Sequence, residues 1–431
     1  MNSARRLRLP RHRATTAHAC VLYPWHADEG LGQRGVYIGS NESGGGGAWC
    51  FDPFQLYTDG VITSPNVLVV GDVGSGKSTA VKTFLYRSIG QLHSGTPSLP
   101  RWCAIVDPKG EYAPLASALD LSQLRLYPGG PVRLNPLDAG LQSGTDDEVR
   151  ARRLSLVAAL AGAALRRDLS TIEDAALGWA IDSVTTARGA TPTLHDVAHL
   201  LAEPTSEMAR QARETPEALT RQIADVRHAL TKLLSGQLRG MFDGLSTEHT
   251  TWSKRGLVID LSAVHHDRDA LTAVMVAATG WLQAVLTAAG GDVMPRRVQV
   301  LEEIWALLSS ERTARYLQSS QKLARSYGVA NISIAHRIAD LRAQADDGTA
   351  TAKIGMGLLA DTQTRILFRQ STDQIAEAAD LLGLTEPERL ILPRLIRGRA
   401  LWHVGDRRAV VQHRVSDAEL AICDTNARLV I

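Results

Sequence analysis

Short apolar runs bounded by turn residues alternate with helical stretches along most of the chain. This alternation is the pattern of an α/β protein. Several runs are apolar at nearly every position, as expected for strands that helices cover on both faces of a mostly parallel sheet. The predicted strands cover residues 66–70, 103–107, 257–261, 298–301, 331–335, 364–368, 401–404 and 410–413. The pattern therefore predicts the α/β fold class with a mostly parallel central sheet.

Residues 145–235 differ in character, because they are rich in Ala, Leu, Arg and Glu and carry helix-start signals. Thr145 with Glu148, and Ser170 with Glu173, have the spacing of capping boxes, in which each side chain bonds the backbone N–H of the other residue. This block is predicted to be an all-helical insertion within the α/β domain.

Three parts are predicted along the chain. Residues 1–60 form a basic tail and a small N-terminal segment with a flexible Gly-rich loop at 43–47. Residues 61–144 and 236–431 form one α/β domain, and residues 145–235 form the inserted all-helical domain. No apolar stretch follows the basic tail, so it does not resemble a secretion signal. The tail is interpreted as disordered, and the alternative is a tether for anionic lipid or DNA.

Composition narrows the classes of function. The 431 residues suit two or three domains, or one large domain with an insertion. The formal net charge is +2, so any contact with DNA must come from local patches. The four cysteines form no C-x-x-C pair, which fits neither a disulfide framework nor a zinc site. We therefore expect a cytoplasmic protein.

The segment GDVGSGKS at residues 71–78 matches the phosphate-binding pattern G-x-x-x-x-G-K-[ST] at every fixed position. A predicted strand precedes it and a predicted helix at 78–89 follows, and such a helix start favours anions. The residues expected to bind the nucleotide are Gly71, Gly74, Ser75, Gly76, Lys77, Ser78 and Thr79. Lys77 would reach the β- and γ-phosphates, Ser78 would bind Mg²⁺ and Thr79 would touch the α-phosphate.

Hydrolysis needs carboxylates at the ends of buried strands, one for Mg²⁺ and one for the attacking water. Three predicted strands end in acids, at Asp107, at Asp260 and at the pair Glu302 and Glu303. Only the third strand end has two adjacent acids, so Glu302 is assigned to the metal and Glu303 to water activation. The alternative is that both are solvated acids at a helix start.

Two later residues are candidates for the same site. His336 follows the predicted strand at 331–335 and would sense or orient the γ-phosphate, unless it is a structural histidine. Arg325 precedes that strand and would reach a neighbouring subunit's nucleotide, unless it is a solvated helix cap.

Residues 271–291 carry no charge over about the length of a membrane span. They are rich in Ala and Thr and only modestly apolar. A single crossing would also place the preceding strand, ending at Asp260, and the following strand, ending at Glu302, on opposite sides of a membrane. A buried helix is therefore predicted.

Several segments, taken in order, resemble the RecA-like ATPases of the HerA/FtsK branch, and within it the conjugative-transfer and type IV secretion ATPases. They are NVLVVGDVGSGKST, IVDPKGEY, RLNPLD, MFDGLST, GLVIDLS, VLEEIW, KLARSYGVANISIAHRIADL and LLADTQTRILFRQ. Lys77 and Ser78 match the family's P-loop pair, Glu303 its catalytic carboxylate and Arg325 its trans-acting arginine. Glu302 replaces the usual Asp and His336 the usual Gln.

The resemblance implies a RecA-like domain with an all-helical insertion, ATP and Mg²⁺ as cofactors, and a homo-oligomeric, hexameric ring with ATP bound between subunits. It also implies secretion or conjugation channel proteins as partners, with DNA as a further partner, and a peripheral position at the inner face of the plasma membrane through those partners.

Three functions follow from these observations. The first is the energising ATPase of a conjugation or type IV secretion apparatus. The second is a coupling-type DNA pump, and since such proteins usually carry N-terminal membrane helices, none of which is predicted here, the first is favoured. The third is a scaffold that binds ATP to assemble but hardly hydrolyses it, as the substitutions at Glu302 and His336 suggest.

Overall fold

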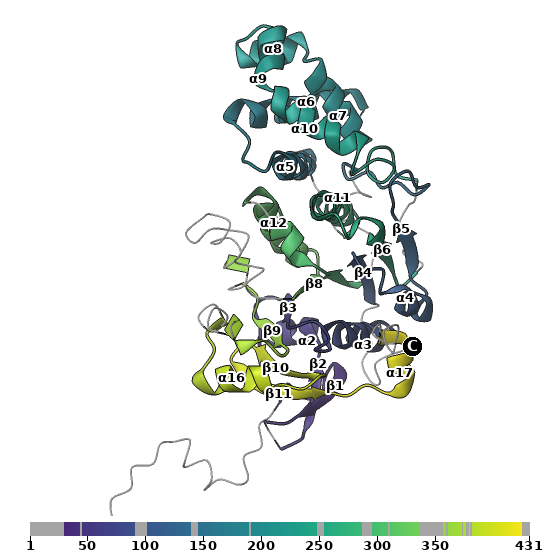
Figure 1. Ribbon diagram of the computed structural model, residues 1–431, viewed down its shortest axis with the longest axis vertical. Coiled ribbons are helices and arrows are strands. Elements are labelled where there is room, and N and C mark those ends of the chain that lie inside the picture. The colour runs from purple at the N-terminus through teal and green to yellow at the C-terminus, as the bar shows by residue number, and fades with distance from the viewer. Residues whose placement is uncertain are drawn as a thin grey trace, which may run out of the picture.

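The computed structural model describes residues 30–43, 45–90, 101–138, 145–188, 191–247, 254–286, 295–308, 311–336, 357–358, 361–372, 374–375, 379 and 382–424. The molecule is elongated, with one sheet through its lower half and a group of helices at the far end (Figure 1).

Within the described residues, the strands form one 11-stranded sheet in the order β2-β1-β11-β10-β9-β3-β8-β7-β4-β6-β5. The strands are β1 Val36–Asn41, β2 Ala48–Phe51, β3 Val67–Val70, β4 Arg101–Asp107, β5 Ser122–Arg125, β6 Gly256–Asp260, β7 Arg296–Leu301, β8 Val329–Ala335, β9 Thr364–Leu367, β10 Arg399–Val404 and β11 Arg407–His413. Strands β9 to β5 in that order are parallel, and the remaining strands are antiparallel to their neighbours. The predicted α/β class with a mostly parallel sheet is confirmed.

Both faces of the parallel strands are buried. On β3, Leu68 and Val70 belong to one apolar core while Val67 and Val69 belong to the other. Helices α5 Asp146–Leu165, α11 Arg268–Leu286 and α12 Glu311–Ser326 cover the first face. Helices α3 Lys77–Gly90 and α4 Ala113–Leu119 cover the second. This double covering explains why the strands are apolar at nearly every position.

All eight predicted strands are present, and three further strands were missed. β5 has the sequence SQLR with alternating half-buried and exposed residues, so it lacks an apolar run. β1 and β2 are short and form a hairpin. The hairpin falls within the predicted small N-terminal segment, whose bounds stay a prediction, and the pairing of β1 with β11 joins it to the main sheet. Residues 1–29 of the predicted tail lie outside the described residues.

The predicted helical block contains six helices among its described residues. They are α5 Asp146–Leu165, α6 Thr171–Arg188, α7 Leu194–Ala202, α8 Ser206–Ala212, α9 Pro216–Gln222 and α10 Ala224–Ser235. The capping box of Thr145 and Glu148 is present, and Ser170 and Glu173 exchange the equivalent hydrogen bonds. Its division from the α/β part as a domain stays a prediction.

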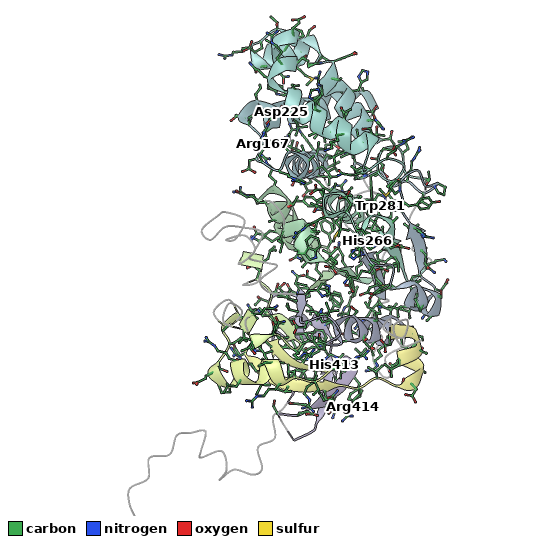
Figure 2. The ribbon with its side chains drawn as sticks, in the orientation of Figure 1. Arg167, Asp225, His266, Trp281, His413 and Arg414 are labelled. Atoms are coloured by element: carbon green, nitrogen blue, oxygen red, sulfur yellow. The ribbon has the colours of Figure 1, made fainter. Side chains whose placement is uncertain are left out.

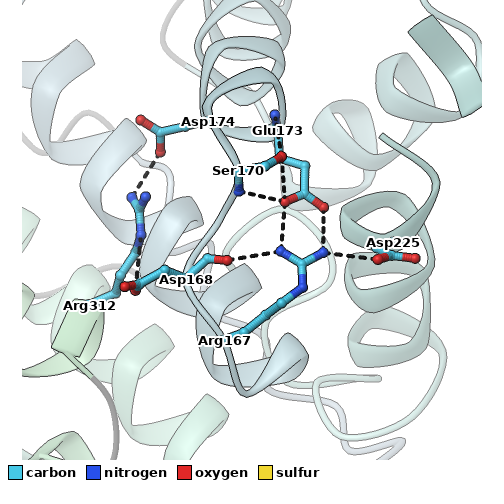
Figure 3. A network of polar contacts seen from close by, with 7 residues as sticks. All are labelled: Arg167, Asp168, Ser170, Glu173, Asp174, Asp225 and Arg312. Atoms are coloured by element: carbon cyan, nitrogen blue, oxygen red, sulfur yellow. Dashed lines mark hydrogen bonds and ion pairs between the residues drawn. The ribbon is translucent and has the colours of Figure 1, made fainter. Parts of the chain in front are cut away.

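Helix α5 of this block lies directly on the α/β part. A Cβ added to Gly280 of α11 would stand 2.7 Å from Leu156 Cδ1 of α5, so the glycine permits the close approach of the two helices. A second link is polar and is drawn in Figure 3, where Arg312 of α12 pairs with Asp174 of α6 at 2.8 Å. The helical block is thus tied to α11 and α12.

Helix α11 matches a membrane span in length and apolarity, but it is buried along nearly its whole length. Trp281 of this helix lies in the middle of the molecule (Figure 2). The prediction of a buried helix at this position is confirmed for its described residues, which end at Leu286.

Helix α17 Asp417–Cys423 covers α3 near the end of the chain. The Arg87 guanidinium of α3 donates to both carboxylate oxygens of Glu419, at 2.6 and 2.7 Å, and to the carbonyl of Arg414 at 2.7 Å. The helix that follows the phosphate loop is therefore fixed to the C-terminal segment by a buried ion pair.

Candidate functional site

The glycine-rich loop at residues 71–76 connects β3 to α3, as predicted. Gly74 and Gly76 have φ of 77° and 109°, which favour glycine over other residues. A Cβ on Gly71 would stand 2.5 Å from Phe368 Cβ, and a Cβ on Gly76 would stand 3.1 Å from the backbone nitrogen of Gly398. Each of these glycines is therefore required by conformation or by space.

Lys77 begins α3 and is almost fully buried. Its Nζ donates to the carbonyl of Gly71, and to the carbonyl of Asp72 at 2.9 Å. Burial lowers the pKa of Lys77 to about 8, while the nearby Glu302 opposes that shift. A buried lysine beneath a loop of this conformation, at the start of a helix, fits the binding of phosphate.

The remaining predicted ligands of the nucleotide lie in the glycine-rich loop or in the first turn of α3. Ser75 is buried, and its Oγ donates to the carbonyl of Asp72 at 2.7 Å, which closes the loop. Ser78 and Thr79 follow in the first turn of α3, and both are half-buried. Their hydroxyls are therefore placed at the helix end that faces the loop.

The strand-end acids lie at one edge of the sheet, because β4, β6 and β7 are parallel to one another. Asp107 accepts from the backbone nitrogens of Lys109 and Tyr112, and Asp260 accepts from that of Ser262. These two acids thus shape their own turns. The glutamates after β7 are both buried, which excludes the alternative of solvated helix-start acids.

Glu302 is held by Tyr112, whose hydroxyl donates to Glu302 Oε1 at 2.7 Å. Burial raises the pKa of Glu302, and the Tyr112 hydrogen bond opposes this. Glu302 and Glu303 both oppose the lowering of the Lys77 pKa, so the glutamate pair lies near enough to the phosphate loop to act on it electrostatically.

Glu303 lies at the centre of a cluster of polar side chains. Its Oε1 is 2.5 Å from Lys109 Nζ and 2.8 Å from His336 Nε2, and its Oε2 accepts from Trp305 Nε1. Burial alone would raise the pKa of Glu303, but the hydrogen bond and charge of His336 and the charge of Lys109 outweigh it, and the pKa is below its ordinary value. Glu303 therefore stays ionised.

His336 directly follows β8, the strand next to β3, and the structure places its side chain beside Glu303. Arg325 belongs to the last turn of α12, and its side chain lies outside the described part of the chain.

Sequence reasoning missed Lys109 and Tyr112. Both belong to the segment DPKGEY directly after β4, so their position beside a strand-end acid was the signal that could have identified them.

The site suits a metal ion that binds together with a nucleotide. Among the described residues, no group of three or more His, Cys, Asp or Glu side chains gathers to hold a metal ion. Magnesium bound with a nucleotide needs only one or two protein oxygens, since phosphates and waters supply the rest. Ser78 and Glu302 suit that requirement.

Comparison with known proteins places the fold. No family model matches the sequence. No curated protein matches it either. Among solved structures, the chain is similar to VirB4 of Thermoanaerobacter pseudethanolicus, with a TM-score of 0.68 and 20% identity over 91% of this chain and 100% of that one.

It is also similar to the bacterial conjugative coupling protein TrwB, with a TM-score of 0.57 and 16% identity over 82% of this chain and 85% of that one. A structure of the plasmid coupling protein TrwB with ADP and Mg²⁺ has a TM-score of 0.58. The chain therefore has the RecA-like fold that these proteins share, as the sequence predicted.

Proposed function

We propose that this chain is an ATP-hydrolysing motor of a conjugative-transfer or type IV secretion system, energising assembly or the transport of DNA or protein across the envelope. The observation that carries the proposal is the presence of a complete phosphate loop after β3 and of a buried Glu303 after β7, two strands away at the same carboxyl end of the parallel sheet. The likeness to VirB4 over the whole length of that chain supports the choice of system.

The roles of the residues follow from their positions. Backbone N–H groups of the loop and the Lys77 amine would bind the phosphates of ATP, so that Lys77 exchanges its contacts with the loop carbonyls for phosphate oxygens. Ser78 and Glu302 would hold Mg²⁺, which neutralises charge on the phosphates when bound. Glu303 would accept a hydrogen bond from the attacking water and orient it.

Two proposed roles concern neighbours. Arg325 would reach the nucleotide of an adjacent subunit in a hexameric ring, where an arginine stabilises the charge of the transition state. Channel proteins of the secretion or conjugation machinery would recruit the ring to the inner face of the plasma membrane.

The VirB4-like motor is preferred over a coupling-type DNA pump because the likeness to TrwB is lower and covers less of this chain. Affinity purification from the native host, followed by ATPase assays with and without DNA, separates the two. Channel subunits as partners and DNA-independent turnover support the motor. A relaxase among the partners, with DNA-stimulated turnover that weakens steeply with salt, supports the DNA pump.

The scaffold alternative predicts a different result. Such a protein would bind ATP with its Lys77 loop but would turn it over no faster than the Lys77→Ala variant. Nucleotide binding measured with a fluorescent ATP analogue, beside turnover of the same sample, distinguishes a scaffold from a motor.

A further inference from the structure

The turn at residues 107–112 contacts both of the paired glutamates, Glu302 and Glu303. Asp107 fixes its conformation by accepting from the backbone nitrogens of Lys109 at 3.2 Å and of Tyr112 at 2.9 Å. Gly110 within it has a φ of 69°, and a Cβ there would stand 3.2 Å from Ser262 Cβ. The turn is therefore rigid and closely packed.

Two side chains of this turn point at the glutamates. Lys109 Nζ lies 2.5 Å from Glu303 Oε1, and the Tyr112 hydroxyl donates to Glu302 Oε1 at 2.7 Å. Tyr112 is fully buried, and only about a quarter of the Lys109 side chain is exposed, at 26%. Charge-assisted hydrogen bonds of this kind are short and strong, so they can fix a carboxylate in one orientation.

Glu303 needs such support, because its backbone is strained. Its φ of 54° is in the left-handed region, which a residue with a Cβ occupies only when its surroundings hold it there. A carboxylate offers about four acceptor positions. Lys109 Nζ and His336 Nε2 both lie within hydrogen-bond distance of Oε1 and are 2.8 Å from each other, and Trp305 Nε1 takes one position on Oε2. One position on Oε2 then remains to accept a hydrogen bond from a single water.

We propose that this turn positions the glutamate pair, with Lys109 as the positioning residue of Glu303 and Tyr112 that of Glu302. The inference rests on the proposed function, because it assigns the support of the carboxylate that would orient the attacking water.

The test uses the full chain with Lys109→Met, and with Lys254→Met as the matched control. Lys254 is also paired with an acid, Asp120 at 3.3 Å, but it precedes β6 and so lies at the opposite edge of the sheet. We expect Lys109→Met to lower the maximal rate of ATP hydrolysis by about 100-fold, as a displaced catalytic group does. Affinity for a fluorescent ATP analogue should stay within about twofold, and Lys109→Arg should restore part of the rate.

A second readout needs no turnover. In the nucleotide-free protein, hydrogen exchange of residues 302–308 should accelerate in Lys109→Met and not in Lys254→Met. In a Glu303→Gln background, Lys109→Met should change the residual rate by less than about twofold, since the group that it positions is already disabled. Tyr112→Phe should raise the Mg²⁺ concentration for half-maximal activity by about tenfold.

The outcomes separate the inference from the proposed function. If Glu303→Gln is inactive while Lys109→Met turns over like the wild type, the proposed function stands and the positioning role is wrong. Loss of nucleotide binding in Lys109→Met would instead make Lys109 a phosphate ligand and also overturn the inference. If the wild type hydrolyses no ATP, the proposed function fails, and unchanged exchange at residues 302–308 would then reject the positioning role independently.

Discussion

The ion pair between Arg87 and Glu419 is predicted to be the main attachment of helix α17 to the helix after the phosphate loop. Only 10% and 9% of the two side chains are exposed, and two hydrogen bonds join them. Neutralising one member of a buried pair costs about 3–5 kcal/mol, because the other charge stays buried without its partner. Since about a tenth of each side chain still reaches solvent, we expect the lower end of this range, about 3 kcal/mol, for Glu419→Gln. Glutamine keeps the capping-box geometry with Ser416 through its amide oxygen, but its NH2 group cannot accept from Arg87 Nε, so the variant loses the charge and one of the two hydrogen bonds.

This cost should appear as local opening of α17, because the freed Arg87 is solvated when the helix detaches. At pH 7, a cost of about 3 kcal/mol corresponds to a loss of protection by about two orders of magnitude. Hydrogen exchange of the amides of α17, measured on the full chain, gives this number directly. Asp417→Asn is the matched control, since it removes the same charge from an exposed position of the first turn and should cost less than about 1 kcal/mol.

The effect should depend on pH in a defined direction. The hydrogen bond from Arg87 lowers the pKa of Glu419 to about 2 from an ordinary value of 4.5. A depressed carboxylate pKa adds stability that is complete above about pH 4.5 and is lost as the pH falls toward 2. The ratio of wild-type to Glu419→Gln protection should therefore be about tenfold smaller at pH 3.5 than at pH 7. Equal exchange of α17 in wild type and variant at pH 7 would refute this reasoning.

Two further predictions concern packing and charge in the helical part. Gly280→Val should lower the free energy of unfolding by about 1–3 kcal/mol, because the added atoms meet Leu156, whereas Gly178→Ala, whose added Cβ would stand at an ordinary contact distance of 3.8 Å from Arg150 Nη2, should raise it by about 0.5–1 kcal/mol. Thermal unfolding measures both, and a stabilised Gly280→Val would contradict the close approach of α11 and α5. In the network of Figure 3, Glu173→Ala should cost about 2 kcal/mol, because Glu173 is buried and bound by Arg167 through both oxygens. Asp225→Ala removes an exposed partner of the same arginine and should cost about 0.5 kcal/mol or less, so equal losses in the two variants would show that burial does not decide the strength of this network.

Much of the parallel sheet could be predicted from the sequence, because its strands are buried on both faces and are therefore apolar at nearly every position. Strand β5 could not, since its side chains alternate between half-buried and exposed. The hairpin of β1 and β2 acquires its place only by pairing with β11, which is more than 350 residues away along the chain. Pairing over such a distance leaves no local signal in either segment.

The candidate site, like the fold, could be predicted from the sequence only in part. The phosphate loop is a continuous motif, so Lys77 and Ser78 could be identified from spacing alone. The pairing of Glu303 with Lys109 joins the ends of two strands that are far apart in the sequence. The residues around each of them give no sign of this pairing. The side chain that a lysine faces is decided by the order of strands in the sheet. That order is β7 next to β4, and it becomes evident only in the structure.

ATP hydrolysis by Glu303 is tested by the steady-state ATPase rate of the wild type beside Lys77→Ala and Glu303→Gln, with nucleotide binding measured on the same samples. We expect Lys77→Ala to lose both binding and turnover. Glu303→Gln should bind ATP like the wild type but lose turnover by about 100-fold or more. Equal rates in all three proteins would contradict the claim that this chain is an ATP-hydrolysing motor with Glu303 at its centre.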